Sequence, residues 1–183
     1  MGGVLRLGVL AVESPDPVLS VVAPLGLAAA VETALVIDLA GGLRVQSDRT
    51  LADLIEDGPT RAELSPGRSG VAVLSGHTLD PAPAMIAIEE LAASWPAVVL
   101  RCRPGQMPVR TVPVRPLLPG YFLTPDETPS VWQPVGTRAR PPGPGPVLPR
   151  LSASLVRRLL SGRLPGRSRW VASWRPVWDM PWA

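Results

Sequence analysis

A chain of 183 residues, 46% of them hydrophobic, suits one domain with an appendage better than two full domains. A single cysteine excludes an intramolecular disulfide framework and fits a reducing compartment. The longest uncharged apolar stretch, residues 18–31, is shorter than the roughly twenty residues of a membrane-spanning helix and contains a proline, so we expect no such helix. All eighteen basic residues are arginine, and this bias, together with abundant Ala, Gly and Pro, is typical of a high-GC bacterial genome.

The net charge of +3 conceals an asymmetry along the chain. Residues 1–100 carry a net charge of −7, whereas residues 101–183 carry +10. A basic half of this kind suits an acidic protein, a nucleic acid or an anionic lipid as partner. The alternative is that its arginines solvate a Pro-rich surface and neutralise the acidic half of the same chain.

The first forty residues consist of short apolar runs separated by turn residues. The run Val4–Val12 predicts a strand, and Ser14–Pro17 a turn. Val18–Pro24 is a β-branched run that predicts a second, buried strand, and Leu25–Glu32 predicts a helix of about two turns. Ala34–Leu39 then predicts another buried strand.

The same alternation of strands and helices continues to residue 100. Thr50–Glu56 predicts a helix with Thr50 as its N-cap, and Val71–Leu74 predicts a short strand. Pro83–Ser94 has the apolar spacing of an amphipathic helix, and Ala97–Leu100 predicts the next strand. This order builds a parallel sheet with crossover helices, so we predict an α/β domain of three layers.

After residue 103 the composition changes, because sixteen of the twenty-four prolines lie in residues 101–183. Residues 109–116 alternate Val with other residues and predict a strand at the edge of the sheet, since Pro113 and Pro116 lack the N–H that a central strand needs. Residues 138–149 (RARPPGPGPVLP) predict a semi-rigid, extended linker.

Two features of the C-terminal region point to a binding surface. Residues 148–162 predict a short basic amphipathic helix, and tryptophans then follow at intervals of four residues. Exposed tryptophans are costly, so we expect these rings to be covered either by the protein's own sheet or by a partner's groove. The candidate partner-binding residues are Leu151, Leu155, Arg157, Arg158, Leu159, Trp170, Trp174, Trp178 and Trp182.

Residues 18–104 resemble the MinD/ParA group of P-loop ATPases. VLSVVAP stands where that group has the first strand before its phosphate loop, and ALVIDLAGGL resembles the second strand, whose terminal aspartate matches Asp38. TLADLIEDG and GVAVLSG resemble the helix and strand that follow. AMIAIEELAASWPAVVLRCRPG resembles the helix and strand that lead to the Walker B aspartate. The resemblance implies a P-loop NTPase-like fold.

The chain departs from this family at three parts of the nucleotide site. The segment in the place of the phosphate loop, Ala23–Ala28, has one glycine and a proline, and the chain has no lysine for the β- and γ-phosphates. Arg101 stands where a magnesium-directing carboxylate is expected. We therefore expect a pseudo-ATPase with no cofactor, no metal and no catalytic residue.

Other chemistry-bearing residues have plain structural interpretations. Asp38 is expected to cap the following turn through its side chain. Cys102 follows an apolar run and predicts a small buried side chain; nucleophilic use would need His77 as a neighbouring base. The acidic pairs at residues 56–57 and 89–90 are expected on solvated helix surfaces rather than together in a catalytic cleft.

These observations predict a small three-layer parallel-sheet domain over residues 1–123, a Pro-rich linker over 124–149, and an extended arm with a basic helix and a Trp-rich tail over 150–183. The resemblance implies a non-catalytic adaptor or assembly and positioning protein that docks through this arm on a protein partner, itself MinD/ParA-like or a secretion, pilus or division component. The alternatives are a peripheral membrane protein or a nucleic-acid-binding protein using the Arg/Trp region, and an enzyme with an unrecognised site. We expect no small-molecule substrate. We expect a cytoplasmic location, or one at the inner face of the membrane reached through a partner.

Overall fold

The computed structural model describes residues 8–43, 49–61, 63–64, 70–76, 81–105, 109–118, 127–136, 140–161 and 168–182. Its strands are β1 (Gly8–Glu13), β2 (Thr33–Asp38), β3 (Gly70–Ser75), β4 (Ala97–Arg101), β5 (Thr111–Leu117) and β6 (Val131–Pro134). Its helices are α1 (Leu19–Ala29), α2 (Leu51–Asp57), α3 (Pro81–Ser94), α4 (Ala153–Leu160), α5 (Arg169–Ala172) and the 3-10 helix η1 (Arg175–Asp179).

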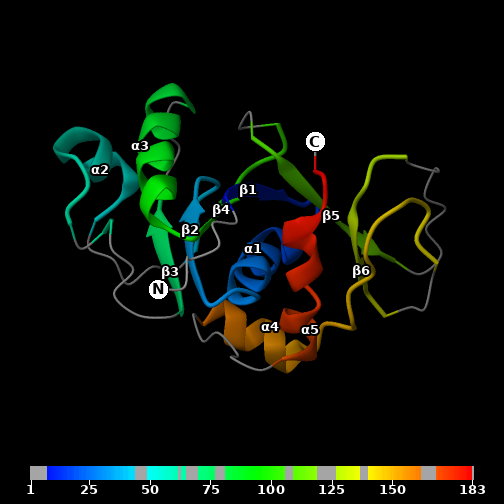
Figure 1. Ribbon diagram of the computed structural model, residues 1–183. Helices are drawn as coiled ribbons and strands as arrows, with labels where there is room; N and C mark the ends of the chain where they lie inside the picture. Colours follow the sequence, from blue (N-terminus) through cyan, green and yellow to red (C-terminus); the bar gives the residue numbers. More distant parts are fainter. Residues whose placement is uncertain are drawn as a thin grey trace, which may run out of the picture.

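The six strands form one parallel sheet in the order β3-β2-β4-β1-β5-β6 (Figure 1). Helices α2 and α3 lie on one face of the sheet, while α1, α4 and α5 lie on the other. Successive side chains of a strand point to opposite faces, so Leu10 and Val12 of β1 enter the α1 side and Ala11 enters the α2–α3 side. The predicted three-layer α/β architecture with a parallel sheet is confirmed.

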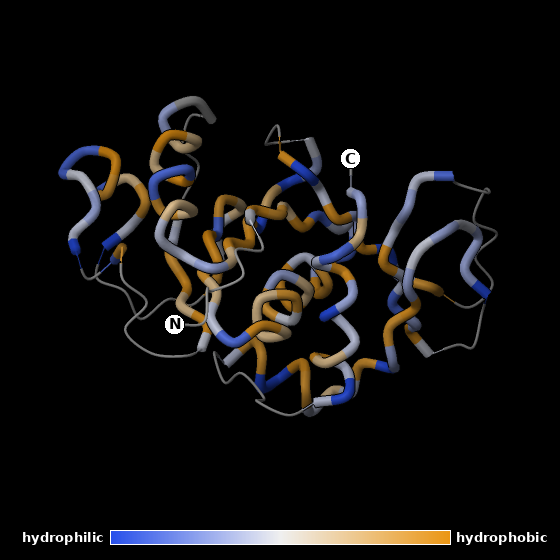
Figure 2. Tube along the Cα trace, viewed as in Figure 1, coloured by the Kyte–Doolittle hydropathy of each residue, from blue (hydrophilic) through white to orange (hydrophobic). Residues whose placement is uncertain are grey.

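Burial on both faces explains the composition of the strands. A parallel sheet covered by helices on both sides needs apolar side chains at nearly every position. In β2 every residue of the run Ala34–Asp38 is buried, and all five residues of β4 are buried. The strands are accordingly among the most hydrophobic segments in Figure 2.

The prediction of a strand over Val18–Pro24 is wrong, because this run forms the first half of α1. Pro24 lies inside the helix and has no N–H to donate to the carbonyl of Ser20, four residues earlier. That carbonyl accepts a hydrogen bond from Arg101 Nε instead, at 2.9 Å. A side chain from β4 thus compensates for the proline.

The prediction that residues 109–116 form an edge strand is also wrong, because β5 lies between β1 and β6. Residues 111–113 of β5 pair with β1, and residues 114–117 pair with β6. Each half of β5 therefore has a paired strand on one side only. A strand of this kind tolerates the missing N–H groups of Pro113 and Pro116 despite its internal position.

The helix predicted to begin after Thr50 has the expected N-cap. The Thr50 hydroxyl accepts a hydrogen bond from the backbone N–H of Asp53, and the Asp53 carboxylate accepts one from the backbone N–H of Thr50 at 2.6 Å. This reciprocal pair is a capping box. The backbone and side-chain hydrogen bonds from Thr50 lower the pKa of Asp53 below its usual value of 3.8.

The Pro-rich segment lies against the sheet rather than extending away from it. Residues 144–148 run alongside β6: Ser130 N–H donates to the Pro144 carbonyl, Trp132 N–H donates to the Pro146 carbonyl, and Leu148 N–H donates to the Trp132 carbonyl, at 2.9–3.0 Å. Gly145 permits this approach, since its φ is +122° and a Cβ there would lie 2.0 Å from the Ser130 carbonyl oxygen. The expectation of an extended arm is not confirmed. None of the described helices is long and apolar enough to cross a membrane.

Candidate functional site

The carboxyl ends of β2 and β4 carry the two residues that the sequence analysis compared with acidic positions of MinD/ParA ATPases. Asp38 ends β2 and Arg101 ends β4, and the two strands pair with these residues in register. Arg101 Nη1 lies 2.7 Å from Asp38 Oδ1. Asp38 is fully buried and Arg101 is 8% exposed. The two side chains thus form a buried ion pair at the edge where ligands bind in parallel α/β sheets.

Both groups of this ion pair have further partners. Asp38 Oδ1 accepts a hydrogen bond from Gly41 N–H at 2.9 Å, and Oδ2 accepts one from Leu43 N–H at 2.7 Å. Arg101 Nη1 also donates to the Gly41 carbonyl, while Nε holds the Ser20 carbonyl of α1. The predicted capping role of Asp38 is confirmed. Its pairing with Arg101 was not predicted, although opposite charges at the ends of two adjacent parallel strands were a usable signal.

The loop between β1 and α1 occupies the position of a phosphate loop in a strand–loop–helix unit. Asp16 Oδ1 accepts a hydrogen bond from Leu19 N–H at 2.8 Å, so a carboxylate of the chain itself lies at the N-terminus of α1. Pro15 and Pro17 offer no N–H groups. The assignment of residues 23–28 to the phosphate loop is wrong, because that segment is buried inside α1.

A cavity of about 490 Å³ opens in the crevice between β1 and β5. The chain leaves β1 toward β2 and leaves β5 toward β6, on the other side, so this crevice is a topological switch point. Five prolines line it, and its charged side chains are Glu13, Asp16 and Arg115. The Arg115 guanidinium lies over the Trp132 ring, 5.9 Å from its centroid. Two carboxylates and few N–H donors suit an apolar or cationic group better than a phosphate.

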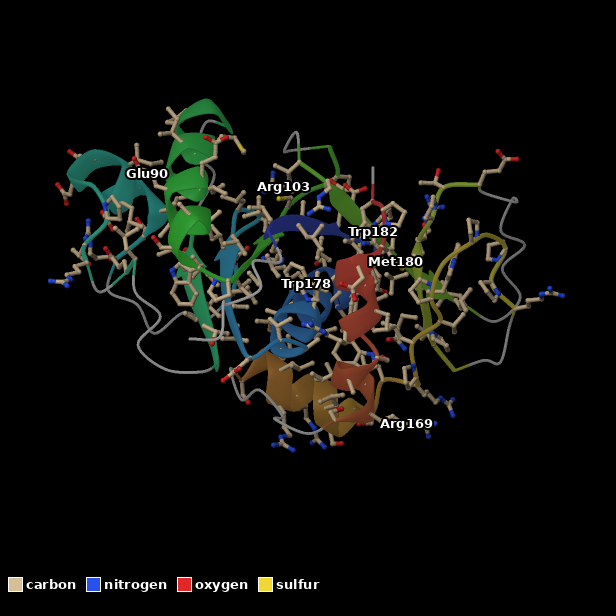
Figure 3. All side chains as sticks on the ribbon, viewed as in Figure 1. Glu90, Arg103, Arg169, Trp178, Met180 and Trp182 are labelled. Carbon is tan, nitrogen blue, oxygen red and sulfur yellow. The ribbon has the colours of Figure 1, made fainter. Side chains whose placement is uncertain are left out.

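The four tryptophans that the sequence analysis singled out are buried in the protein's own core. Each is at most 6% exposed, and all pack in the cluster that includes α1. The rings of Trp170 and Trp174 form an edge-to-face pair with centroids 5.5 Å apart. Trp178 and Trp182, which are labelled in Figure 3, belong to this same buried cluster, which also contains residues of β1 and β2. These side chains cover the protein's own domain, which is the first of the two alternatives that the sequence analysis left open.

Three of the four indole N–H groups in this tail have hydrogen-bond partners. Trp170 Nε1 donates to Gln133 Oε1 at 2.7 Å, Trp178 Nε1 donates to the Leu27 carbonyl at 3.1 Å, and Trp182 Nε1 donates to the Val177 carbonyl at 2.7 Å. Trp174 Nε1 is buried without a partner among the described residues. Gln133 was not predicted as important, yet it is fully buried and ties β6 to α5.

The basic helix α4 divides its predicted partner-binding residues between two sides. Leu159 is buried, and Leu155 and Leu151 are half-buried against the same core. Leu151 also lines a cavity of about 240 Å³ beside the end of β6. Arg157 and Arg158 are exposed. Of the nine predicted residues, these two arginines are therefore the ones open to a partner.

Cys102 has the environment of a structural thiol. Its side chain is buried, and burial, followed by the charges of Glu13 and Asp38, raises its pKa to about 12. The thiol is therefore protonated at neutral pH, and the thiolate that nucleophilic chemistry needs is scarce. The prediction of a small buried side chain is confirmed, while His77 lies outside the described residues. The acidic pairs at residues 56–57 and 89–90 are exposed, as expected.

Comparison with protein-family models, with curated proteins and with solved structures finds no match to this chain. The resemblance to MinD/ParA ATPases therefore rests on the residue patterns alone. The feature of the structure that bears most directly on nucleotide binding is the set of charges at the carboxyl edge of the sheet, formed by Asp16, Asp38 and Arg101.

Proposed function

We propose that the protein is a non-catalytic, P-loop NTPase-like adaptor that binds a protein partner through the arginines of α4. The observation that carries this proposal is the buried ion pair of Asp38 and Arg101. Phosphoryl transfer needs a carboxylate that directs magnesium and donors that hold the phosphates. In this chain the β2 carboxylate is paired with a guanidinium, and β4 ends in that guanidinium instead of a carboxylate.

The loop after β1 supports the same proposal. An anion at the N-terminus of a helix is stabilised by free N–H groups and by the helix dipole. At α1 the Asp16 carboxylate already takes this position, and a nucleotide phosphate would meet its negative charge. Both features disfavour a nucleoside triphosphate at this edge, so we assign the domain a scaffolding role.

The surface of the C-terminal region supports protein binding through charge. The four tail tryptophans are buried, so the charged side chains dominate its exposed chemistry. All six arginines in residues 140–161 and 168–182 are exposed, and the same ranges contain one acidic residue, Asp179. Such a surface steers acidic partners toward it and discriminates against basic ones. The partner we propose presents an acidic surface and is a component of a secretion, pilus-assembly or division system.

The first test is calorimetric titration of the purified protein with ATP and magnesium, alongside an active MinD-type ATPase as a positive control. We expect no heat of binding up to millimolar nucleotide, since the Asp16 carboxylate repels the phosphates and Asp38, paired with Arg101, is not free to direct magnesium. Micromolar binding would reject the interpretation of this edge as a lost nucleotide site.

The second test addresses the α4 surface with charge reversal. We expect R157E/R158E to lose a partner that the wild type retains in affinity capture and in reconstitution from purified components. The matched control is R140E/R175E, which changes the net charge equally at exposed arginines outside α4. Equal binding by all three proteins would contradict the role of α4.

The alternative of membrane binding has less support from the structure than protein binding has. Interfacial anchoring uses exposed aromatic and aliphatic side chains, and the four tail tryptophans are buried. Flotation of the protein with vesicles rich in anionic lipid would nevertheless favour the membrane, and salt-dependent retention of nucleic acid on filters would favour nucleic-acid binding.

A further inference from the structure

Helix α3 presents an exposed stripe that combines one apolar side chain with two carboxylates. Ile86 is 64% exposed, and Glu89 and Glu90 are exposed three and four residues later. This spacing places the three side chains on one side of the helix. The opposite side of α3 carries Leu91 and Ile88, which are buried against the sheet. The exposed stripe is thus an outer face without a function in the core.

Helix α4 also combines an exposed apolar side chain with exposed charges, here of the opposite sign. Leu160 is 44% exposed, and the exposed Arg157, three residues earlier, lies on the same side of the helix, whereas the exposed Arg158 lies further around it. Five large hydrophobic side chains are exposed among the described residues, and Ile86 and Leu160 are the two of these that lie on helices. Ile86 therefore stands beside two carboxylates, and Leu160 stands beside the guanidinium of Arg157.

The two stripes cannot meet within one molecule. Helix α3 belongs to the layer on one face of the sheet and α4 to the layer on the other face. In Figure 3, Glu90 on α3 and Arg169 at the start of α5 lie on opposite sides of the molecule. Any pairing between the two stripes must therefore join different molecules.

The charge around each stripe extends this complementarity to the whole layer. The described residues in the ranges 49–64 and 81–94, which contain α2 and α3, include six acidic residues and two arginines. The described residues in the ranges 140–161 and 168–182 include six arginines and one aspartate. Opposite potentials of this kind favour contact between unlike layers and oppose contact between like layers.

We propose that the partner of α4 is a second copy of this chain, which presents its α3. In this contact Glu89 and Glu90 of one copy face Arg157 of the next, Arg158 lies at the margin of the contact, and Ile86 packs beside Leu160. The inference rests on the α4 surface of the proposed function and names its partner. Because the two surfaces differ, a pair of copies still leaves one α3 and one α4 free, so association is head-to-tail and open-ended.

The size of the surfaces sets the strength of the association. One helix face on each side buries less than the roughly 1,200 Å² of a stable interface, so the contact is of the weak, transient class. Exposed ion pairs are screened at high ionic strength. Self-association should therefore rise with protein concentration and fall with salt.

The test is sedimentation velocity of the purified protein over a range of concentrations from micromolar to millimolar. We expect the weight-average mass to increase with concentration at low salt, and the association constant to fall by about tenfold or more between 50 mM and 500 mM NaCl. A monomeric mass at every concentration in low salt would overturn the proposal.

Charge-reversal variants identify the surfaces. We expect R157E/R158E and E89R/E90R each to be monomeric alone, and to associate when mixed, because each then offers a charge that the other lacks. The fourfold variant E89R/E90R/R157E/R158E keeps the wild-type composition of charge and should recover self-association. Controls with the same net charge are R140E/R175E and E127R/D179R, which should associate as the wild type does.

The outcomes separate this inference from the proposed function. If the controls lose association as fully as the α3 and α4 variants do, or if the fourfold variant stays monomeric, a pairing of α3 with α4 is rejected. Each variant is first checked by circular dichroism against the wild type, so that an unfolded protein is recognised. If the wild type is monomeric while another protein still binds α4, the self-association fails and the adaptor role stands.

Discussion

The two helical layers of this protein are built in different ways. The α2–α3 layer consists of crossover helices that lie beside the strands they connect, and its exposed charged residues are mainly acidic. The opposite layer combines α1 with α4, α5 and η1, which follow it by more than a hundred residues, and its exposed charged residues are mainly arginine. The hydrogen bond from Trp178 Nε1 to the Leu27 carbonyl joins residues 151 positions apart.

This difference shows that the C-terminal region completes the domain. Without residues 168–182, the side of α1 that packs on Trp170, Trp174 and Trp178 would be exposed to solvent. A sheet buried on both faces needs a cover on each side, and the second cover here comes from a distant part of the chain. The basic character of this layer is therefore a property of the folded domain.

The largest expected effect comes from removing a central side chain of the layer formed by α1, α4, α5 and η1. Trp174→Ala removes a fully buried ring and should lower the free energy of unfolding by about 3–5 kcal/mol, measured by urea denaturation. Trp95→Ala in the α2–α3 layer, where the indole donates to the Glu63 carbonyl at 2.8 Å, is the matched comparison. If Trp174→Ala costs almost nothing while Trp95→Ala is severe, residues 168–182 do not complete the core.

Stability should be nearly as sensitive to the ion pair of Asp38 and Arg101, which joins β2 and β4 at the carboxyl edge of the sheet. Arg101→Met leaves the Asp38 carboxylate buried without its charge partner, and we expect a loss of about 3–5 kcal/mol in the free energy of unfolding. The double variant D38N/R101M removes both charges and should be less destabilised than R101M alone. Equal losses for the two variants would show that the charge on Asp38 does not matter.

Adding one methyl group at Gly26 of α1 tests how closely the tail tryptophans pack on this helix. Gly26→Ala would place its Cβ 2.4 Å from the Trp170 ring and 2.7 Å from Trp174 Nε1. Alanine is the better helix former by about 1 kcal/mol, but the clash should dominate and lower the free energy of unfolding by about 1–3 kcal/mol. In a W170A background the ring is gone, so the penalty should shrink. A stabilising Gly26→Ala in the wild type would mean that the rings do not pack closely on α1.

The smallest expected effect on stability comes from the capping box of Thr50 and Asp53 at the start of α2. The folded-state pKa of Asp53 is lowered, so its contribution to stability is present above its unfolded value of 3.8 and is lost as the pH falls through the folded value. We expect wild type to have a higher melting temperature than Asp53→Asn at pH 7, and this difference to shrink below pH 3.8. In a Thr50→Ala background, which removes the hydroxyl partner, the pH dependence of the difference should weaken.

Local patterns were sufficient where local interactions decide the structure. The segments that became β2, β3, β4, α2 and α3 were predicted with small errors at their ends, because apolar periodicity and the Thr50 cap are signals within a few residues. The strand prediction for Val18–Pro24 was wrong because a distant part of the chain decides the structure there. Valine and proline disfavour a helix locally, and the Arg101 side chain that satisfies the Ser20 carbonyl comes from 81 residues further along the chain.

At the candidate site, the residue types were predicted from the sequence, but their pairing was not. The absence of lysine and the arginine at position 101 could be read directly, and the turn-capping role of Asp38 follows from residue type. The pairing of Asp38 with Arg101 depends on β2 and β4 being neighbours, which is a property of strand order. The position of Asp16 at the start of α1 depends on a helix that was predicted to begin at Leu25, six residues later than it does.

By itself, the sequence determined the class of architecture, the absence of lysine and the opposite charges of the two halves, because these depend on residue type and local spacing. Tertiary structure alone decided what covers the four tryptophans, where β5 lies in the sheet and which arginines remain exposed. Those outcomes depend on which distant surfaces meet, since burial of a large apolar ring is favourable against any matching surface. The cover in this protein is its own α1, which leaves the arginines of α4 exposed.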